Sequence, residues 1–456
     1  MIDRSSAPLA AKKALFQIPQ TEKFSLENGI EVYFTHKNNL PIVYLSAVTS
    51  AGSKFDSPDK VGTAYLTSLL IDEGAGEFNS LQLSNEFEKL GSMFHVSANQ
   101  DNIGFSLLTL AENFERSLYL LGSVLTKPRF EQPDFDREKK KVQDKLLQLK
   151  DESGYIASSV FEKLVFRNTY YEFPEIGLAE TVNQISNEDV KNFYRNGFSG
   201  NATKFFIAGN LDPEELRKTL NAQIGSWVSS SASELAFNYP LRSQTQYYIV
   251  DKKESAQSEI RIGHISKKRN VPDFYATRIM NSILGGQFSS RINLNLREDK
   301  GFTYGAGSNF NYYANAGLFE VQTAVNLQST AAAVKEIFKE LNGIRSGITE
   351  KEIEFAKSYL IKQYPSRFET FSQIAKNVES LVIHSLPLDE LKVYEEKLYS
   401  VTYEEVRQSA LENIFPDEMF VVICGEKENV AKQLKDELGV DAIELTHEGN
   451  AVLGLV

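Results

Sequence analysis

The sequence predicts an α+β fold made of two homologous domains, each an antiparallel sheet covered on one face by helices. Three observations lead to this prediction. Strand-like runs with apolar residues at every second position alternate with helical runs of period 3.6. The order of these runs occurs twice, and a small, polar, aperiodic segment beginning at Ser229 separates the two copies. We therefore expect domains at residues 1–228 and 246–456, joined by a linker at residues 229–245.

The elements of the first copy can be assigned in order from their turn and capping residues. After an irregular arm at residues 1–22, Asn28-Gly29 marks the turn of a hairpin, and residues 41–49 alternate like a half-buried strand. Ser57, followed by a proline, is expected to cap a helix that ends at Gly74. The remaining predicted elements are a helix from Ser80, strands at 93–98 and 103–110, helices at 113–125, 133–149, 156–166 and 187–194, a strand at 203–208 and a helix from Pro213.

A shift of 216 residues aligns the two copies. At this shift FIAG matches VICG, SNEDV matches TYEEV, and FSLLT matches VQTAV, at residues 206–209 and 422–425, 186–190 and 402–406, and 105–109 and 321–325. The start of a long helix at residues 130–135 matches residues 348–353 at a shift of 218. One shift shared by strands, caps and helix starts indicates a duplicated unit.

Composition limits the classes of partner and site. The net charge of −12 disfavours nucleic acid or an anionic membrane surface as a partner and is compatible with basic peptides. A single cysteine, Cys424, rules out an internal disulfide. No run approaches the ~20 apolar residues of a membrane-spanning helix. The N-terminal stretch lacks a long apolar core, so we expect the chain as it stands in the cytoplasm, or in the periplasm if a signal segment has been removed.

One stretch, LGGQFSSRINLNLREDKGFTY at residues 284–304, has the plan of helix, break, helix, turn and strand. A glycine pair ends one apolar helix, and a Lys-Gly pair ends the next. Arg297 falls in the last turn of the second helix, and Tyr304 opens an alternating run. A guanidinium and a phenol placed in this way can point into one space and donate hydrogen bonds to a carbonyl oxygen. The spacing alone is also typical of an arginine in a surface ion pair and a tyrosine in a core.

The duplicated order of elements, together with this stretch, resembles the insulinase/pitrilysin family of zinc peptidases. The similarity is greatest to half-length members such as the mitochondrial processing peptidase subunits and their bacterial relatives, and it extends from LENGIEV at residues 26–32 to Gly425. Active members carry His-x-x-Glu-His in the first helix after the strand pair. Its histidines share a helix face and bind zinc, while the glutamate acts on the bound water. A glutamate in a later long helix is the third zinc ligand.

The zinc-binding residues of the family are replaced in this sequence. The two histidine positions fall on Tyr65 and Leu69, and the glutamate position falls on Ser68. The third ligand falls on Lys145, or on Asp144 if the alignment slips by one residue. A lysine ammonium would repel a zinc ion, so the resemblance implies the fold of a zinc-binding half without its chemistry.

No cofactor or metal is therefore expected in this chain. The leucines of the degenerate motif, Leu66, Leu69 and Leu70, are expected to pack in the place of the metal site. A zinc pair elsewhere would need histidines three to five residues apart, and no two of the five histidines are so spaced: His36, His95, His264, His384 and His447.

The C-terminal half keeps a second feature of the family. Active members use an arginine and a tyrosine, in a phrase such as Arg-Glu-Lys-Arg-Gly-Leu-Ala-Tyr, to hold the substrate carbonyl and its developing oxyanion opposite the zinc. Here the phrase is REDKGFTY, from Arg297 to Tyr304, and it follows a Gly-Gly-x-x-Ser-Ser-Arg match at residues 285–291.

The resemblance implies that this chain is the non-zinc-binding subunit of a two-subunit metallopeptidase. It would be inactive alone, and Arg297 and Tyr304 would act on a peptide at the zinc of a homologous partner subunit, in a heterodimer or a larger assembly. The strand at residues 93–98 would correspond to the sheet edge to which a substrate peptide adds in the family.

Two alternatives stay open at this point. Some relatives are structural core subunits of large assemblies, so the chain could be an inert scaffold or a peptide-binding subunit in which Arg297 and Tyr304 merely pack. An independently active peptidase with an unconventional site is the third hypothesis. A neighbouring gene that encodes a chain of similar length with an intact His-x-x-Glu-His would favour the two-subunit peptidase.

Overall fold

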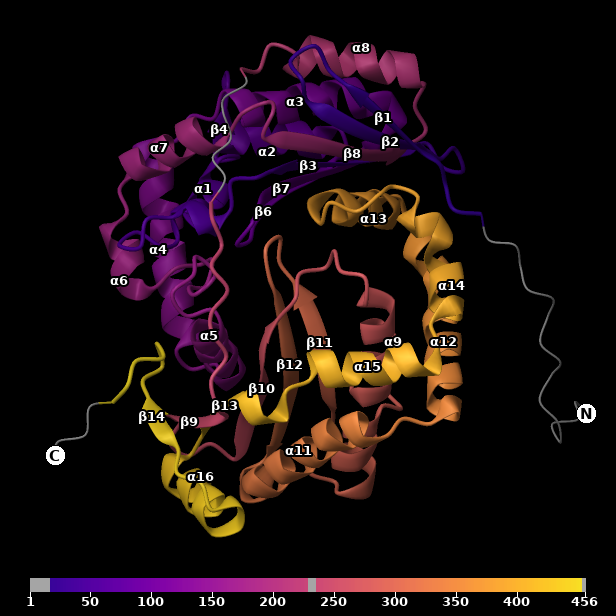
Figure 1. Cartoon of the computed structure of the whole chain (residues 1–456). Coiled ribbons are helices and arrows are strands. Elements are labelled where there is room, and N and C mark those ends of the chain that lie inside the picture. Colours follow the sequence, from indigo (N-terminus) through magenta and orange to yellow (C-terminus); the bar gives the residue numbers. More distant parts are fainter. Residues whose placement is uncertain (1–16, 229–234, 453–456) are drawn as a thin grey trace, which may run out of the picture.

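The structure is a computed structural model that describes residues 17–228 and 235–452 (Figure 1). The predicted N-terminal arm lies outside these residues up to position 16, as does the first part of the predicted linker. Residues 235–245 contain no helix or strand. The described residues form two six-stranded sheets, one above the other in Figure 1, and helices surround both.

The first sheet has the strand order β1-β2-β8-β3-β7-β6. All neighbours are antiparallel except β2 and β8, which are parallel. The strands are β1 (Thr21–Ser25), β2 (Glu31–His36), β3 (Ile42–Thr49), β6 (Met93–Ala98), β7 (Ile103–Leu110) and β8 (Thr203–Gly209). The short pair β4 (Gly74–Ala75) and β5 (Phe78–Asn79) stands apart from this sheet.

The second sheet repeats this topology, with the order β11-β12-β10-β13-β9-β14. Its strands are β9 (Gln246–Asp251), β10 (Gln257–Ser266), β11 (Ala306–Tyr312), β12 (Gly317–Asn326), β13 (Phe420–Gly425) and β14 (Ile443–Leu445). Gly209 ends β8 beside the last residue of β2, and Gly425 ends β13 beside the last residue of β9. The two glycines therefore occupy equivalent places, as the shift of 216 residues predicts. Only the sixth strand differs, because β1 precedes its sheet in the chain and β14 follows its own.

Helices follow the same order in both copies. The first copy has α1 (Thr63–Leu70), α2 (Ser80–Lys89), α3 (Phe114–Thr126), α4 (Gln132–Leu149), α5 (Ser153–Val165), α6 (Ala179–Gln184), α7 (Asn187–Gly197) and α8 (Pro213–Ile224). The second has α9 (Phe274–Leu284), α10 (Arg291–Asn293), α11 (Thr330–Ser346), α12 (Glu350–Gln363), α13 (Phe371–Ile383), α14 (Glu390–Ser400), α15 (Tyr403–Asn413) and α16 (Lys427–Gln433). Matching segments carry matching caps: Ser186 before α7 and Thr402 before α15 both form capping boxes.

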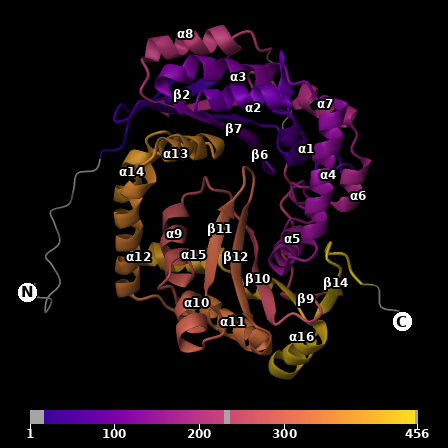
Figure 2. The same ribbon diagram turned by 180° about the vertical axis from the view of Figure 1, so that it is seen from behind.

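Each sheet also receives one helix from the other half of the chain. Helix α13 packs on β3 and β8 of the first sheet, and α5 packs on β10 and β13 of the second (Figures 1 and 2). Successive side chains along a strand point to opposite faces of the sheet, so each strand contributes apolar residues to the cores on both faces. In β2, for example, Val32 and Phe34 belong to the core of the first half, whereas Tyr33 lies on the α13 side.

The predicted fold class is confirmed, since the chain forms two α+β units of one topology. The helix from the other half on the second face of each sheet was not foreseen, because amphipathic periodicity shows that a helix is buried without showing against what. The division at residues 228 and 246 remains our proposal; the strands of the two sheets lie within residues 21–209 and 246–445.

One predicted helix start is wrong. Residues 57–62 form turns, and α1 begins at Thr63. Its N-terminal amides are satisfied by Asp56 and not by Ser57: the Asp56 carboxylate accepts from Gly62 N at 2.8 Å and from Ala64 N at 2.9 Å. A carboxylate from the preceding loop reached the helix end in place of the predicted serine cap.

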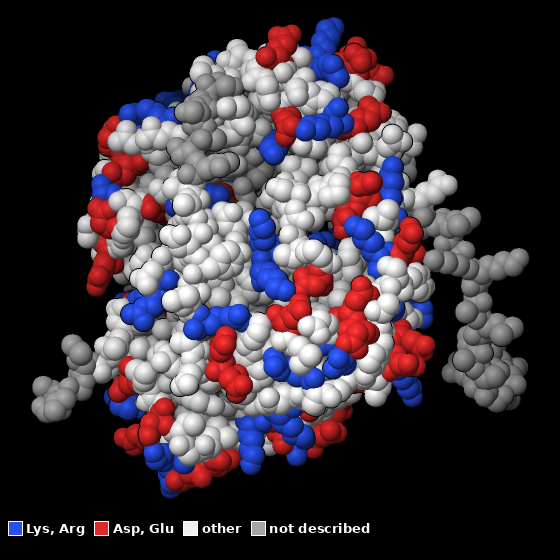
Figure 3. Space-filling view, viewed as in Figure 1, with Lys and Arg blue, Asp and Glu red and all other residues white. Residues whose placement is uncertain are grey.

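The molecular surface carries both signs of charge. On the face shown in Figure 3, acidic and basic side chains are interspersed, so the net charge of −12 is not gathered into one field on that face. Within residues 17–228 and 235–452, no helix combines the length and the apolar character that crossing a bilayer requires.

Candidate functional site

Helix α1 holds the positions that carry zinc ligands in active family members, and it is packed rather than polar. Leu66 and Leu70 are fully buried in the core of the first half, and Leu69 packs against this core. Ser68 is also buried, and its hydroxyl donates to the carbonyl of Tyr65 at 2.7 Å, so it is used within the helix. The predicted packing of the three leucines is confirmed.

The third ligand position offers no alternative. Lys145 lies on α4, which packs against α1, and its ammonium is 3.5 Å from a carboxylate oxygen of Glu152. Asp144 points elsewhere and pairs with Lys140 at 2.8 Å on an exposed face of α4. If the alignment is shifted by one residue so that Asp144 takes the third ligand position, its carboxylate is still directed toward Lys140 and does not replace the missing ligand.

These residues do not fit a zinc ion. Tyr65 is half-buried, and burial followed by the charge of Glu175 raises the pKa of its phenol above the ordinary value, which opposes the phenolate that a metal ligand would need. Leu69 has no donor atom, and Lys145 is a cation. Within the described ranges, no group of three or more histidine, cysteine, aspartate or glutamate side chains is placed to hold a metal.

Arg297 lies in a π-helical turn, Leu294–Asp299, that continues α10. Its guanidinium lies over the ring of Phe288 at 4.4 Å. The Nη1 atom is 3.0 Å from an oxygen of Glu298, but the two are not aligned for a hydrogen bond, and this buried nitrogen has no other partner in the described residues. The turn ends at Gly301, whose φ of +66° favours glycine.

Tyr304 is presented by a fixed turn. The hydroxyl of Thr303 accepts from Gly305 N at 3.1 Å and donates to Gly305 O at 2.9 Å, and Thr323 of β12 donates to both Thr303 Oγ1 and Gly305 O. The side chain of Tyr304 is 94% exposed. The prediction that Tyr304 stands at a strand start is wrong, because this turn delays β11 until Ala306.

The predicted pair is close in the chain, but its two side chains do not touch. No hydrogen bond, ion pair or ring contact joins Arg297 to Tyr304 in the parts of the chain that the structure describes. Both side chains instead have exposed surface: Tyr304 is 94% exposed, and the Arg297 side chain, which lies over the exposed Phe288, is 33% exposed. A carbonyl oxygen from another molecule could therefore reach either donor.

The two sheet edges next to these positions differ. Edge strand β11 is partly covered, because Ser308 N donates to Gly285 O at 3.0 Å and Asn281 Nδ2 donates to Ser308 O at 3.0 Å. Edge strand β6 ends the first sheet and carries the exposed Met93. Strand β6, the predicted peptide-binding edge, is therefore the less obstructed of the two.

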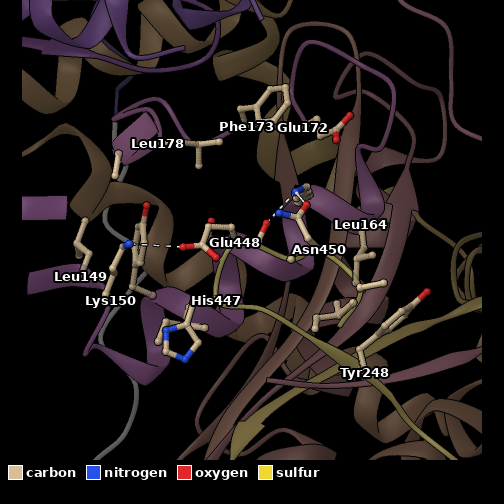
Figure 4. A pocket seen from close by; sticks show the side chains of 18 of the residues that line it. Leu149, Lys150, Leu164, Glu172, Phe173, Leu178, Tyr248, His447, Glu448 and Asn450 are labelled. Atoms are coloured by element: carbon tan, nitrogen blue, oxygen red, sulfur yellow. Dashed lines mark hydrogen bonds and ion pairs between the residues drawn. The ribbon is translucent and has the colours of Figure 1, made fainter. Parts of the chain in front are cut away.

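A cavity of about 870 Å³ lies away from these positions, between α4, α5 and the C-terminal segment (Figure 4). The ammonium of Lys163 donates to the carbonyl of Glu448 at 2.8 Å and to Asn450 Oδ1 at 2.9 Å, and Lys150 pairs with Glu448 at 3.6 Å. Neither member of the Arg/Tyr pair lines this cavity. Its polar contacts join the C-terminal segment to the first half.

Two polar clusters that sequence reasoning missed also join the halves. Buried Asp101 accepts from Tyr171 Oη at 2.7 Å, Ala314 N at 2.8 Å and Lys54 Nζ at 3.2 Å. On α5, burial and then the nearby carboxylate of Glu320 raise the pKa of Glu162 to about 8. No sequence signal places these residues together, because each cluster draws on segments more than 100 positions apart.

Two family models match the sequence. The model described as Insulinase (Peptidase family M16) matches residues 32–175, and the model described as Peptidase M16 inactive domain matches residues 184–360. A protein of Helicobacter pylori named Non-peptidase homolog YmxG is 24% identical over 364 residues, which cover 79% of this chain and 83% of that protein. The Bos taurus mitochondrial-processing peptidase subunit beta is 18% identical over 441 residues, 94% of this chain and 89% of its own.

Solved structures share the fold. A peptidase M16 inactive domain from Pseudomonas fluorescens superposes with a TM-score of 0.83 at 24% identity, covering 89% of this chain and 98% of that one. A protease from Helicobacter pylori superposes with a TM-score of 0.81 at 16% identity, covering 89% and 99%. Matched in sequence by these two models and in fold by these structures, the chain belongs to the insulinase family of peptidases, family M16.

Proposed function

We propose that this chain is the non-zinc-binding subunit of a two-subunit metallopeptidase. In this proposal a homologous subunit carries the zinc, and Arg297 and Tyr304 donate hydrogen bonds to the carbonyl oxygen of a bound peptide. Each donor would be aimed at the oxygen on which negative charge develops, a contribution of about 3 kcal/mol to transition-state stabilisation. The peptide would lie extended along the open edge of β6 or of the equivalent strand in the partner.

The observation that carries the proposal is the placement of Tyr304. Its backbone is fixed on both sides by the Thr303–Gly305 turn and by Thr323, while its ring is 94% exposed. A tyrosine held in this way contributes little to the core of its own chain. A phenol that points outward from a fixed turn is suited to meet a group from another molecule.

The residues at the zinc-ligand positions support the proposal that a different subunit carries the zinc. Tyr65, Leu69 and Lys145 cannot supply a zinc site, so hydrolysis at a zinc would require a second chain. Relatives of this chain are named as subunits, among them the bovine processing peptidase subunit beta and the subunit 1 of the Caenorhabditis elegans cytochrome b-c1 complex. The latter is 22% identical over 461 residues, and because its name describes a subunit of the cytochrome b-c1 complex and not a peptidase, it is the relative that fits the scaffold alternative.

The test is Tyr304→Phe in a complex with a His-x-x-Glu-His homologue from the same organism. Removing the hydroxyl should lower the turnover of a quenched fluorescent peptide about a hundredfold and leave the melting temperature unchanged, because the ring packs against nothing. Tyr403→Phe, at an exposed tyrosine at the start of α15, is the matched control. Unchanged turnover in the Tyr304→Phe complex would favour the scaffold.

A further inference from the structure

The short helix α10 contains a buried amide, that of Asn293, which joins Phe288 to Ala306, a residue close in the chain to Tyr304. Asn293 is only 4% exposed. Its Nδ2 donates to the carbonyl oxygen of Phe288 at 2.6 Å, and its Oδ1 accepts from Ala306 N at 3.1 Å. One side chain therefore bridges the segment before α10 and the first residue of β11.

Both partners of this amide are backbone groups, which fixes its orientation. A carbonyl oxygen can only accept and a backbone N–H can only donate, so the nitrogen of Asn293 must face Phe288 and the oxygen must face Ala306. An aspartate would place two acceptors against each other at the Phe288 carbonyl. A leucine would fill the same space and make neither bond. Asparagine is thus the side chain of this size that satisfies both groups.

On one side, the bridge reaches Arg297 through Phe288. The ring of Phe288 is 69% exposed and the Arg297 guanidinium lies over it at 4.4 Å. An exposed ring has few contacts of its own to fix it, so its position depends on its backbone. The bond from Asn293 to the Phe288 carbonyl holds that backbone, and the ring in turn orients the guanidinium.

On the other side, the bridge reaches Tyr304. Ala306 lies two residues after it, directly beyond the Thr303–Gly305 turn. Its N–H lies at the outer edge of β11, where no strand among the described residues pairs with it. By accepting this N–H, Asn293 anchors the end of the turn that presents the phenol.

We propose that Asn293 is a positioning residue that holds Arg297 and Tyr304 at a fixed separation for a shared carbonyl oxygen. The inference rests on the proposed function, in which both residues act on a peptide bound to the complex. Asn293 touches neither the substrate nor the reacting atoms. It acts through the Phe288 ring and the start of β11.

A matched control exists on the same edge. Asn281 of α9 also joins a helix to β11, donating to Ser308 O at 3.0 Å and accepting from the Ser308 hydroxyl at 2.7 Å. Asn281 is half-buried and carries an amide of the same size, but its partner lies further along β11, and none of its side-chain hydrogen bonds in the described residues involves Phe288. Asn281→Leu therefore reports the cost of losing such a bridge without the link to Arg297.

The experiment compares Asn293→Leu and Asn281→Leu in the full chain. In the chain alone, hydrogen exchange should accelerate at the Ala306 amide only in Asn293→Leu. In the complex with the zinc-bearing homologue, Asn293→Leu should lower kcat roughly a hundredfold with KM changed less, because small displacements of oriented groups are costly. Asn281→Leu should stay within about threefold of wild type while losing a similar amount of thermal stability.

The outcomes separate the two proposals. If Asn293→Leu lowers kcat no more than Asn281→Leu does, Asn293 is only structural and the inference is wrong, while the effect of Tyr304→Phe stands. If Tyr304→Phe leaves turnover unchanged, the proposed function fails and the positioning role fails with it. Should Asn293→Leu not fold, Phe288→Ala removes the exposed ring under Arg297 without touching the core, and an unchanged kcat in that variant would also overturn the inference.

Discussion

Glu162 lies on α5, the helix that packs against the second sheet, and its ionisation should make the stability of the protein depend on pH. Within the described residues, the carboxyl group of Glu162 makes no hydrogen bond or ion pair, although its backbone carbonyl accepts from Phe166 N at 2.8 Å. Burial, then the charges of Glu320 on β12 and Glu175, raise its pKa from an ordinary 4.5 to about 8, and only Arg261 on β10 opposes the shift. Two tyrosines, at positions 155 and 313, are the other titratable neighbours.

The sign and size follow from proton linkage. Between pH 4.5 and about 8 the folded chain keeps a proton on Glu162 that the unfolded chain has lost. The free energy of unfolding therefore falls as pH rises, by up to about 1.4 kcal/mol per pH unit. From pH 6 to pH 8 this single group should remove about 2 kcal/mol, the last part of the slope flattening as the folded carboxyl itself ionises.

Glu162→Gln should abolish this part of the pH dependence. The amide keeps the shape of the side chain and cannot ionise, so the variant should gain about 2 kcal/mol relative to wild type on going from pH 6 to pH 8. Urea unfolding midpoints at pH 6, 7 and 8 measure the difference. Asp56 and Asp72, whose pKa values burial raises to about 7, add the same slope to both proteins and cancel. Glu188→Gln, at an exposed glutamate of α7, is the control, and parallel slopes for wild type and Glu162→Gln would refute the reasoning.

Two further predictions concern the metal and the joint at Asp101. The purified chain should contain no stoichiometric zinc by elemental analysis, because Tyr65, Leu69 and Lys145 stand at the ligand positions; one equivalent of zinc that is lost on altering α1 would contradict this. Asp101→Ala should lower the free energy of unfolding by about 3 kcal/mol in urea titrations, since it leaves the buried Tyr171 hydroxyl and the Lys54 ammonium without their acceptor. A loss below about 1 kcal/mol would show that the two groups find other partners.

Much of the fold was predictable because local rules and the duplication agree. The capping serine at 186 and threonine at 402 lie at equivalent places, and the glycines at 209 and 425 end equivalent strands. Where the pattern of one half leaves an element uncertain, the equivalent segment of the other half supports its assignment. The start of α1 was missed because the acceptor, Asp56, precedes a run of turns and not the helix itself.

The exchange of α5 and α13 between the halves could not be predicted in the same way. Ile156, Val160 and Phe161 mark an apolar face of α5, but their partners on β10 and β13 lie more than 90 residues away. Periodicity gives the buried face of a helix and is silent about which sheet covers it. For the same reason the Arg/Tyr spacing located Arg297 and Tyr304 but gave no sign of Asn293, whose role depends on two backbone groups brought together only by the fold.

The α1 segment and the segment around Arg297 and Tyr304 differ in how far their side chains are packed within the chain, and this difference is relevant to function. At α1 the ligand positions are filled: leucines pack, and the Ser68 hydroxyl is used inside the helix. In the 288–304 segment, by contrast, Phe288 and Tyr304 are exposed, and the buried Nη1 of Arg297 lies 3.0 Å from Glu298 without an aligned hydrogen bond in the described residues. A buried donor that makes no aligned hydrogen bond costs about 1–3 kcal/mol before any ion pair offsets it, and exposed aromatic rings lose the stabilisation that burial would give. The buried Nη1 of Arg297 is out of reach of another molecule, whereas the Tyr304 hydroxyl is open to one. In the proposed function that molecule is the substrate, and Tyr304→Phe in the complex measures whether it is.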